Sequence, residues 1–243
     1  MELATRKLTA EADGIPGYMV APVREGKGPA LLLIHQHSGL TGYLKTEAYK
    51  FAKLGYTTVI PNLYHLLGYP ALTHIDTGTE IQNKTCDEDF VRVIDQGWKF
   101  LLARGNVDPL RVGVAGYCMG GRIGIHFVAA TPEARAFVAY YPSVRDEAST
   151  KIRPRHPCDA AREIKCPSIV LYGGQDGTST IPVQQRVQAS FLENGQPLEW
   201  HFFPYGNHGF ASTESDGYQP ELAELVWPLV VSFLGRELGP PAP

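Results

Sequence analysis

Three side chains in this sequence, a cysteine, an aspartate and a histidine, could together perform nucleophilic catalysis. Cys118 stands in GYCMG, residues 116–120, where an apolar run stops and a helix-like run begins. Asp176 and His208 follow in two glycine-containing segments, YGGQDG and YGNHGF. A thiolate that attacks a carbonyl needs a base to move a proton and a third group to orient that base. The order nucleophile, acid, histidine therefore predicts a site for acyl transfer.

The glycines around Cys118 point to a specific backbone geometry. A strand, a tight turn and a helix, with glycines two residues either side of the central residue, form the nucleophile elbow of α/β-hydrolases, here with cysteine where serine is usual. Side chains at Gly116 and Gly120 would collide with the neighbouring strand and helix, while the strained turn lifts the sulfur off the sheet. The following helix N-terminus favours thiolate over thiol.

Each of these residues also has an ordinary explanation. Cys118 could be a small buried hydrophobe at a glycine-rich strand end. Asp176 could form a turn or cap a helix, and His208 could be a loop histidine. All three occur in the required order, and the last two follow predicted strands, so the catalytic interpretation is favoured.

The surrounding pattern predicts how the elements position this site. Apolar and β-branched runs predict two short strands within 3–21 around the turn DGIPG, and further strands at Ala30–Ile34, 57–64, 111–116, 136–142, 167–174 and 199–204. Helical spacing predicts helices at 46–56, 87–105, Met119 to about Ala130, near Val183–Leu192 and near Pro220–Leu234. The alternation predicts an α/β-hydrolase fold with a mostly parallel central sheet and helices on both faces. The carboxyl ends of its strands would carry the site.

The length and patterning predict one α/β-hydrolase domain over 1–243. The chain has 243 residues, of which 44% are hydrophobic, enough for one large core. The long irregular stretch 143–165 is interpreted as an insertion over the sheet edge. Residues from about 236 to 243, rich in glycine and proline, are expected to form a flexible tail.

The charge composition of the chain indicates which class of molecule it binds. The 22 basic and 25 acidic residues give a net charge of −3 with no long run of either sign, which excludes an electrostatic footprint for nucleic acid or an anionic membrane. No secretory signal or membrane span is visible, and the four cysteines include no CxxC pair. A cytoplasmic monomer or small homo-oligomer that takes a small-molecule substrate is expected.

Several other side chains could take part in chemistry. His35, His37, His65 and His74 could suggest a metal site, but no carboxylate or cysteine cluster completes the set, so no metal is predicted. His37, His65 and Tyr64 could line a substrate cavity, and Tyr117 fits the core. Arg122 is expected to pair with a buried carboxylate, and structural roles are expected for Cys86, Cys158 and Cys166.

The motifs resemble the dienelactone hydrolase family of α/β-hydrolases, which uses a cysteine nucleophile. LLLIHQHSGL, TTVIPNLY, GYCMGGR, YGGQDG and YGNHGFA follow the family order with comparable gaps over nearly the whole chain. The resemblance implies that Cys118 is the nucleophile, His208 the base and Asp176 the orienting acid. It also implies that the backbone N–H groups of Met119 and His37 form the oxyanion hole, and that no cofactor is required.

Two positions depart from the family's characterised lactone hydrolases. Those enzymes carry a glutamate, implicated in thiol activation, where this chain has Gln36, and a substrate-binding arginine where it has Ser212. No counterpart of a second arginine is evident in THIDTGTEIQNK, residues 73–84. Either His208 takes the thiol proton directly or another group substitutes for the glutamate. A substrate without a carboxylate, or one held differently, is therefore favoured.

The predicted activity is hydrolysis of a lactone or carboxylic ester through a thioester acyl-enzyme. A broad carboxylesterase or thioesterase that does not act on dienelactone is one alternative. A peptidase, and a non-catalytic member of the fold that binds a small ligand, are the others, because the fold alone does not choose among them.

Overall fold

The computed structural model describes residues 1–69 and 75–239 and contains one eight-stranded sheet. The strands are β1 Leu3–Leu8, β2 Gly17–Pro22, β3 Gly28–Ile34, β4 Thr57–Pro61, β5 Val107–Tyr117, β6 Phe137–Tyr140, β7 Ser168–Gln175 and β8 Leu198–Asn207. Their order across the sheet is β1-β2-β4-β3-β5-β6-β7-β8. β1 and β2 join antiparallel at one edge, and every pair from β4 to β8 is parallel. The mostly parallel α/β sheet predicted from the sequence is confirmed.

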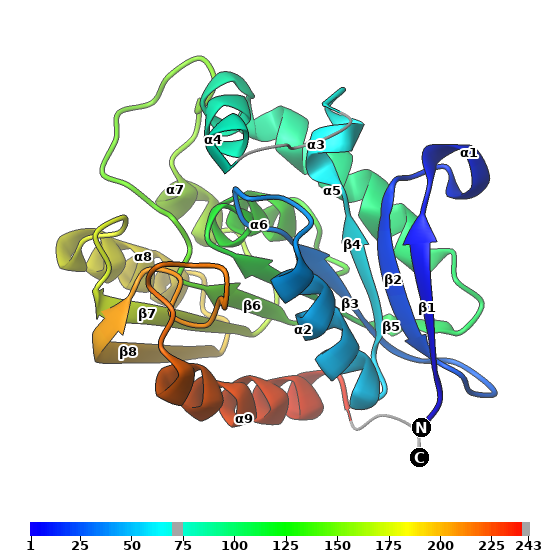
Figure 1. The fold of residues 1–243 in the computed structure, drawn as a ribbon. Helices are drawn as coiled ribbons and strands as arrows, with labels where there is room; N and C mark the ends of the chain where they lie inside the picture. Colours follow the sequence, from blue (N-terminus) through cyan, green and yellow to red (C-terminus); the bar gives the residue numbers. More distant parts are fainter. Residues whose placement is uncertain (70–74, 240–243) are drawn as a thin grey trace.

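Helices cover both faces of this sheet (Figure 1). They are α1 Ala10–Asp13, α2 Gly42–Lys53, α3 Leu63–Leu66, α4 Ile75–Lys84, α5 Asp87–Leu102, α6 Met119–Ala129, α7 Pro157–Ala161, α8 Ile181–Glu193 and α9 Pro220–Glu237. On one face α2 packs against α9, where the rings of Phe51 and Trp227 lie 4.9 Å apart. On the other, α5 packs against α6 through Trp98 and Phe127.

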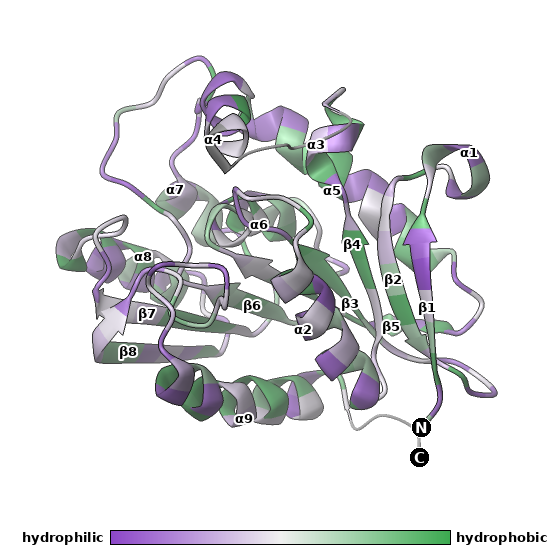
Figure 2. Ribbon diagram, in the orientation of Figure 1, coloured by the Kyte–Doolittle hydropathy of each residue, from purple (hydrophilic) through white to green (hydrophobic). Residues whose placement is uncertain are grey.

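The core follows from the continuous apolar strands. Every residue of β3 and β4 is buried, as expected for strands covered by helices on both faces. Figure 2 shows these strands mainly in the hydrophobic colour, whereas hydrophilic residues lie along the outer helices. The central strands therefore form a rigid support whose carboxyl ends carry the loops described below.

A buried ion pair links the amino ends of α5 and α6. The Arg122 guanidinium donates to both carboxylate oxygens of Asp87, at 2.8 and 2.7 Å. The buried carboxylate partner expected for Arg122 is confirmed. Cys86, for which a structural role was expected, is the N-cap residue of α5.

Some expected boundaries were wrong. The strand predicted over 57–64 ends at Pro61, because the Asn62 side chain accepts from the His65 N–H and starts α3, which contains Tyr64. α2 begins at Gly42 rather than at residue 46, and α1 lies between the two amino-terminal strands. The segment 75–84, for which no element was predicted, forms α4.

The stretch 143–165 was predicted to cover the sheet edge, and this is wrong. It connects β6 to β7, two inner strands, and contains α7, which packs against α6 and α8. The Ile152 carbonyl accepts from the Asp87 N–H at the start of α5. The stretch therefore lies over helices at the carboxyl ends of the strands.

The flexible tail expected from about residue 236 is wrong for its first residues. α9 continues to Glu237, and Leu238 is 1% exposed, so residues 236–238 belong to the folded molecule. Residues 240–243 of the expected tail lie outside the described residues.

Candidate active site

Cys118 lies at the sharp turn between β5 and α6. Its φ of 53° and ψ of −114° are strained for a side chain with a Cβ. A Cβ on Gly116 would lie 2.3 Å from the Gly120 carbonyl oxygen, and one on Gly120 would lie 2.2 Å from that of Ile34. Only glycine fits at these two positions. The turn thus has the geometry that the GYCMG motif predicts.

His208 follows the last residue of β8 and lies beside this turn. Its Nε2 is 3.0 Å from the Cys118 Sγ, and its Nδ1 is 2.9 Å from the Asp176 Oδ2. The His208 side chain is 22% exposed, whereas the Asp176 side chain is completely buried. Three loops at the carboxyl ends of β5, β7 and β8 therefore bring the three predicted residues together.

The Asp176 carboxylate is oriented by its own turn. Its Oδ1 accepts from the backbone N–H groups of Thr178 and Ser179, at 2.8 and 2.9 Å. These bonds leave Oδ2 for the His208 ring. With Nδ1–H donating to Asp176, the His208 Nε2 faces the sulfur.

Tyr141 packs edge to face with the His208 ring, with the centroids 5.4 Å apart. Tyr141 is fully buried and has a φ of 35°, the second non-glycine residue with positive φ among those described. Its ring also packs on Phe210, two residues after His208. Tyr141 was not predicted from the sequence as a site residue. The only sequence feature that could have indicated this role is its position near the end of the strand in AYYP.

The electrostatics favour an ion pair between the sulfur and the imidazole. Burial opposes the charged form of Cys118, but the charge and hydrogen bond of His208, together with His37, lower its pKa to about 5. Burial likewise opposes the charged form of His208, but the Cys118 charge and the hydrogen bond to Asp176 raise its pKa to about 10. At neutral pH the pair is thiolate and imidazolium.

The two predicted oxyanion donors lie on either side of the elbow. Met119 is the first residue of α6, and the part of the chain that the structure describes offers no backbone carbonyl partner for its N–H or for that of His37. The His37 carbonyl accepts from the Tyr64 hydroxyl at 2.6 Å. Tyr64 is buried, and its hydroxyl holds the loop after β3 through this bond.

Gln36 and Ser212 contact one another at the base of the site. The Gln36 Nε2 donates to the Ser38 Oγ at 2.8 Å and to the Ser212 Oγ at 3.3 Å. Gln36 is 7% exposed and Ser212 is buried. His65 is half-buried in α3, and within residues 1–69 and 75–239 no hydrogen bond or ring contact joins it to the triad.

The histidines near β3 do not form a cluster of metal ligands. In the His35 ring Nδ1 donates to the Gln36 carbonyl at 2.8 Å, and Nε2 accepts from the Leu63 N–H at 3.1 Å. Burial lowers the pKa of His35 to about 4, so it is neutral. Among the described residues no three His, Cys, Asp or Glu side chains gather as a metal site, and His74 lies outside them.

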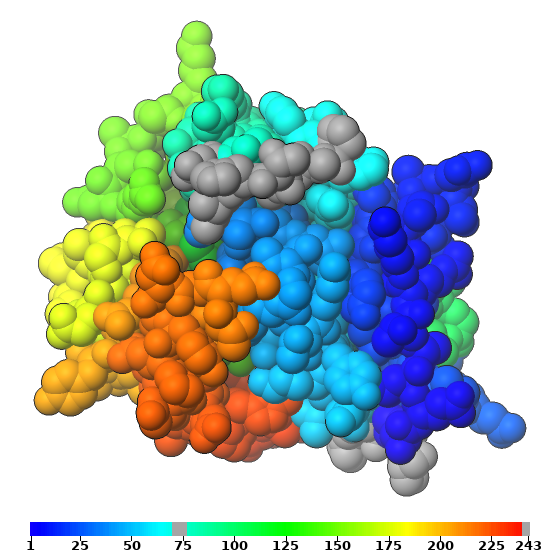
Figure 3. All heavy atoms as spheres, in the orientation of Figure 1, coloured from blue at the N-terminus to red at the C-terminus, as the bar shows by residue number. Residues whose placement is uncertain are grey.

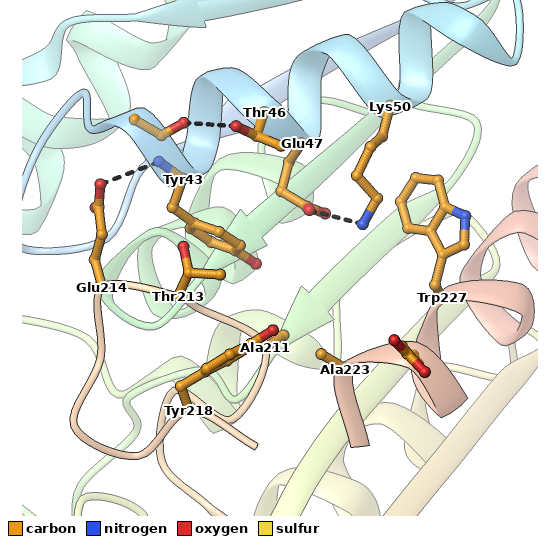
Figure 4. A pocket seen from close by; sticks show the side chains of 12 residues that line it. Tyr43, Thr46, Glu47, Lys50, Ala211, Thr213, Glu214, Tyr218, Ala223 and Trp227 are labelled. Atoms are coloured by element: carbon orange, nitrogen blue, oxygen red, sulfur yellow. Dashed lines mark hydrogen bonds and ion pairs between the residues drawn. The ribbon is translucent and has the colours of Figure 1, made fainter. Parts of the chain in front are cut away.

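A separate cavity of about 640 Å³ lies between α2, the segment 211–218 and α9 (Figure 4). Glu47 and Lys50 form an ion pair at 2.9 Å there, and the Lys50 ammonium lies 3.8 Å from the Trp227 ring centroid. The segment after His208 reaches this cavity because the Glu214 carboxylate accepts from the Tyr43 N–H. Figure 3 shows this segment, in orange, against α2 in blue.

Comparisons with known sequences point to the dienelactone hydrolase family. The sequence profile of the dienelactone hydrolase family matches residues 15–238. A provisionally named carboxymethylenebutenolidase of Methylorubrum extorquens is 29% identical over 91% of this chain and 76% of its own length. A provisionally named 2-oxo-3-(5-oxofuran-2-ylidene)propanoate lactonase of a Bradyrhizobium species is 23% identical over 89% of this chain and 87% of its own.

Solved structures agree on the fold. The crystal structure of a provisionally named dienelactone hydrolase from Klebsiella pneumoniae superposes with a TM-score of 0.87 at 22% identity, and covers 97% of this chain and all of that one. Among the described residues, no helix has the length and apolar content to span a membrane.

Proposed function

Because the chain belongs to the dienelactone hydrolase family, we propose that it hydrolyses a carboxylic ester or lactone through Cys118, His208 and Asp176. The observation that carries this proposal is the pair of distances that join the three side chains, 3.0 Å from Sγ to Nε2 and 2.9 Å from Nδ1 to Oδ2. The names of the relatives from Methylorubrum and Bradyrhizobium support the lactone class.

In the first half-reaction the Cys118 thiolate attacks the substrate carbonyl carbon. The carbonyl oxygen becomes an oxyanion, which the N–H groups of Met119 and His37 stabilise. The bond to the leaving oxygen then breaks, and the His208 imidazolium gives that oxygen its proton. The products are a thioester on Cys118 and an alcohol, which stays attached to the acyl chain when the substrate is a lactone.

In the second half-reaction neutral His208 takes a proton from water as the water oxygen attacks the thioester. The carbon–sulfur bond breaks, the sulfur leaves as thiolate, and His208 is again imidazolium. The acid product releases its proton to solvent. Asp176 holds Nδ1–H throughout, which keeps Nε2 directed at the sulfur.

The acyl group of the substrate is proposed to carry no carboxylate. The position of the family's substrate-binding arginine is Ser212, a neutral side chain that is buried against Gln36. This observation also favours the broad carboxylesterase or thioesterase as the second candidate function. A panel of dienelactone, neutral lactones, short-chain esters and thioesters separates the two by their kcat/KM values.

Replacing the nucleophile tests the proposal directly. Cys118→Ala is expected to abolish turnover of a nitrophenyl ester while the thermal melting curve keeps its cooperative shape. Iodoacetamide is expected to label Cys118 in the parent protein at neutral pH. Unimpaired hydrolysis by Cys118→Ala would refute the assignment, and a parent protein that neither turns over nor is labelled would support a non-catalytic ligand-binding role.

A further inference from the structure

Gln36 cannot carry the thiol activation that a glutamate supplies at its position. An amide does not take a proton at physiological pH. Its Nε2 is also committed, because it donates to the hydroxyls of Ser38 and Ser212. A second activating group for Cys118, if this chain has one, must come from elsewhere.

The side chain of the next residue is placed for this purpose. The His37 Nδ1 lies 4.0 Å from the Cys118 Sγ, within the range of a hydrogen bond to sulfur, and His37 is half-buried. Sγ therefore has two imidazoles within reach, His208 and His37.

The backbone of His37 is held in place from two elements. The Tyr64 hydroxyl of α3 donates to its carbonyl at 2.6 Å. The backbone of α4 packs on the same carbonyl so closely that a Cβ on Gly78 would lie 2.0 Å from the oxygen. These contacts fix the backbone position from which the His37 ring reaches towards the sulfur.

We propose that His37 is a second catalytic imidazole, whose Nδ1–H donates to the Cys118 thiolate in the resting enzyme and again when the sulfur leaves the acyl carbon. This inference rests on the proposed function. His208 has two tasks, because it pairs with the thiolate at rest and must give up its proton to the leaving oxygen. When the thioester carbon–sulfur bond breaks, the sulfur takes the electron pair, and the His37 N–H stabilises that charge together with the His208 imidazolium.

The charges around the sulfur agree with this role. Burial, the largest influence, would raise the pKa of Cys118, and His208 and then His37 lower it. Tyr64 and Tyr141 are the other titratable groups that face Cys118, and burial raises the pKa of both. They stay neutral over the working range, so among the described titratable groups the pKa of Cys118 is lowered by His208 and His37.

The test is the pH dependence of Cys118 alkylation by iodoacetamide, followed by mass spectrometry of the Cys118 peptide so that Cys86, also free, does not interfere. Four full-length proteins are compared: parent, His37→Leu, His37→Asn and His201→Asn. Leucine fills the ring volume without a donor, whereas the asparagine amide nitrogen takes roughly the place of Nδ1. His201, half-buried on β8, is the matched control histidine.

His37→Leu is expected to raise the alkylation midpoint by about one pH unit, as befits one hydrogen bond to a charged group, and to lower kcat/KM for a nitrophenyl ester. His37→Asn should keep a midpoint near the parent's, and His201→Asn should match the parent. A parent-like midpoint in His37→Leu overturns the proposal, and so do equal shifts in the leucine and asparagine variants.

A replacement variant and a substrate-free readout ensure that the experiment tests the role of His37. If His37→Leu does not fold, His37→Ala measured with and without added imidazole replaces it, and imidazole should restore the midpoint. Alkylation needs no substrate. Failure of the hydrolytic function, seen as full activity in Cys118→Ala, is therefore distinguishable from failure of the His37 role.

Discussion

Cys118 and His208 stabilise each other's charged form at a place where burial disfavours both charges. The two groups are 3.0 Å apart, and the attraction outweighs the burial of each. The strained turn at Cys118 makes this proximity possible, because it ends β5 and brings the sulfur to the loop that carries His208. The strained turn therefore places the sulfur where it is ionised and able to attack a carbonyl carbon.

The pH dependence of the reaction is the prediction that belongs to this pair. Activity needs the thiolate and the His208 imidazolium together, so kcat/KM should rise as Cys118 ionises at about pH 5 and fall as His208 loses its proton at about pH 10. Between these limits the profile should be flat. Initial rates with a neutral ester from pH 4 to 11 measure it. A single ionisation near pH 8.5, the value of an ordinary thiol, would contradict the ion pair.

The candidate triad could be predicted from residue types and their order. The turn at the nucleophile requires glycines on both sides, and loops that follow parallel strands meet at the carboxyl edge of the sheet. The ring of His37 could not be placed in the same way. HQHSG offers two histidines, and only the structure tells that His35 is buried and neutral beside Leu63 while His37 approaches the sulfur.

At the level of elements, the loop after β3 depends on two helices that the sequence did not reveal. α3 is four residues long, too short for a helical period to be recognised, and it begins because Asn62 caps it. α4 contains Gly78, which reads as a helix breaker. The glycine is needed there because a bare backbone lets α4 approach the His37 carbonyl.

Gly78→Ala tests this contact. The added Cβ would lie 2.0 Å from the His37 oxygen, and backbone on both sides must shift to relieve the clash. The loop carries a predicted oxyanion donor, so we expect kcat for a nitrophenyl ester to fall by about 100-fold, the loss that a misplacement of about 1 Å can cause.

The matched control is Gly105→Ala, an exposed glycine whose new Cβ would meet no atom within 4 Å. Its kcat should equal that of the parent. If Gly78→Ala also keeps parent kcat, the close approach of α4 does not position the loop.

For the whole molecule, the alternation of strands and helices was sufficient to predict the layered fold, because continuous apolar runs are stable only when both faces are covered. Strand order and the role of 143–165 were not accessible, since they depend on which strands become neighbours. The composition of the carboxyl-terminal end is misleading. The glycine- and proline-rich end suggested a loose tail, yet Leu238 completes the core beside β5.

Leu238 closes the fold by packing the end of α9 onto the middle of the sheet. A Cβ on Gly113 of β5 would lie 3.1 Å from the Leu238 Cδ1, and the Arg111 Nε donates to the Leu238 carbonyl at 2.5 Å. Leu238→Ala should therefore lower the free energy of unfolding by about 2–4 kcal/mol, as for other buried leucines, in urea denaturation monitored by tryptophan fluorescence. Leu225→Ala on the same helix is the control, because Leu225 is 57% exposed and should change stability by less than about 0.5 kcal/mol. Equal effects of the two substitutions would mean that the chain end adds nothing to the core.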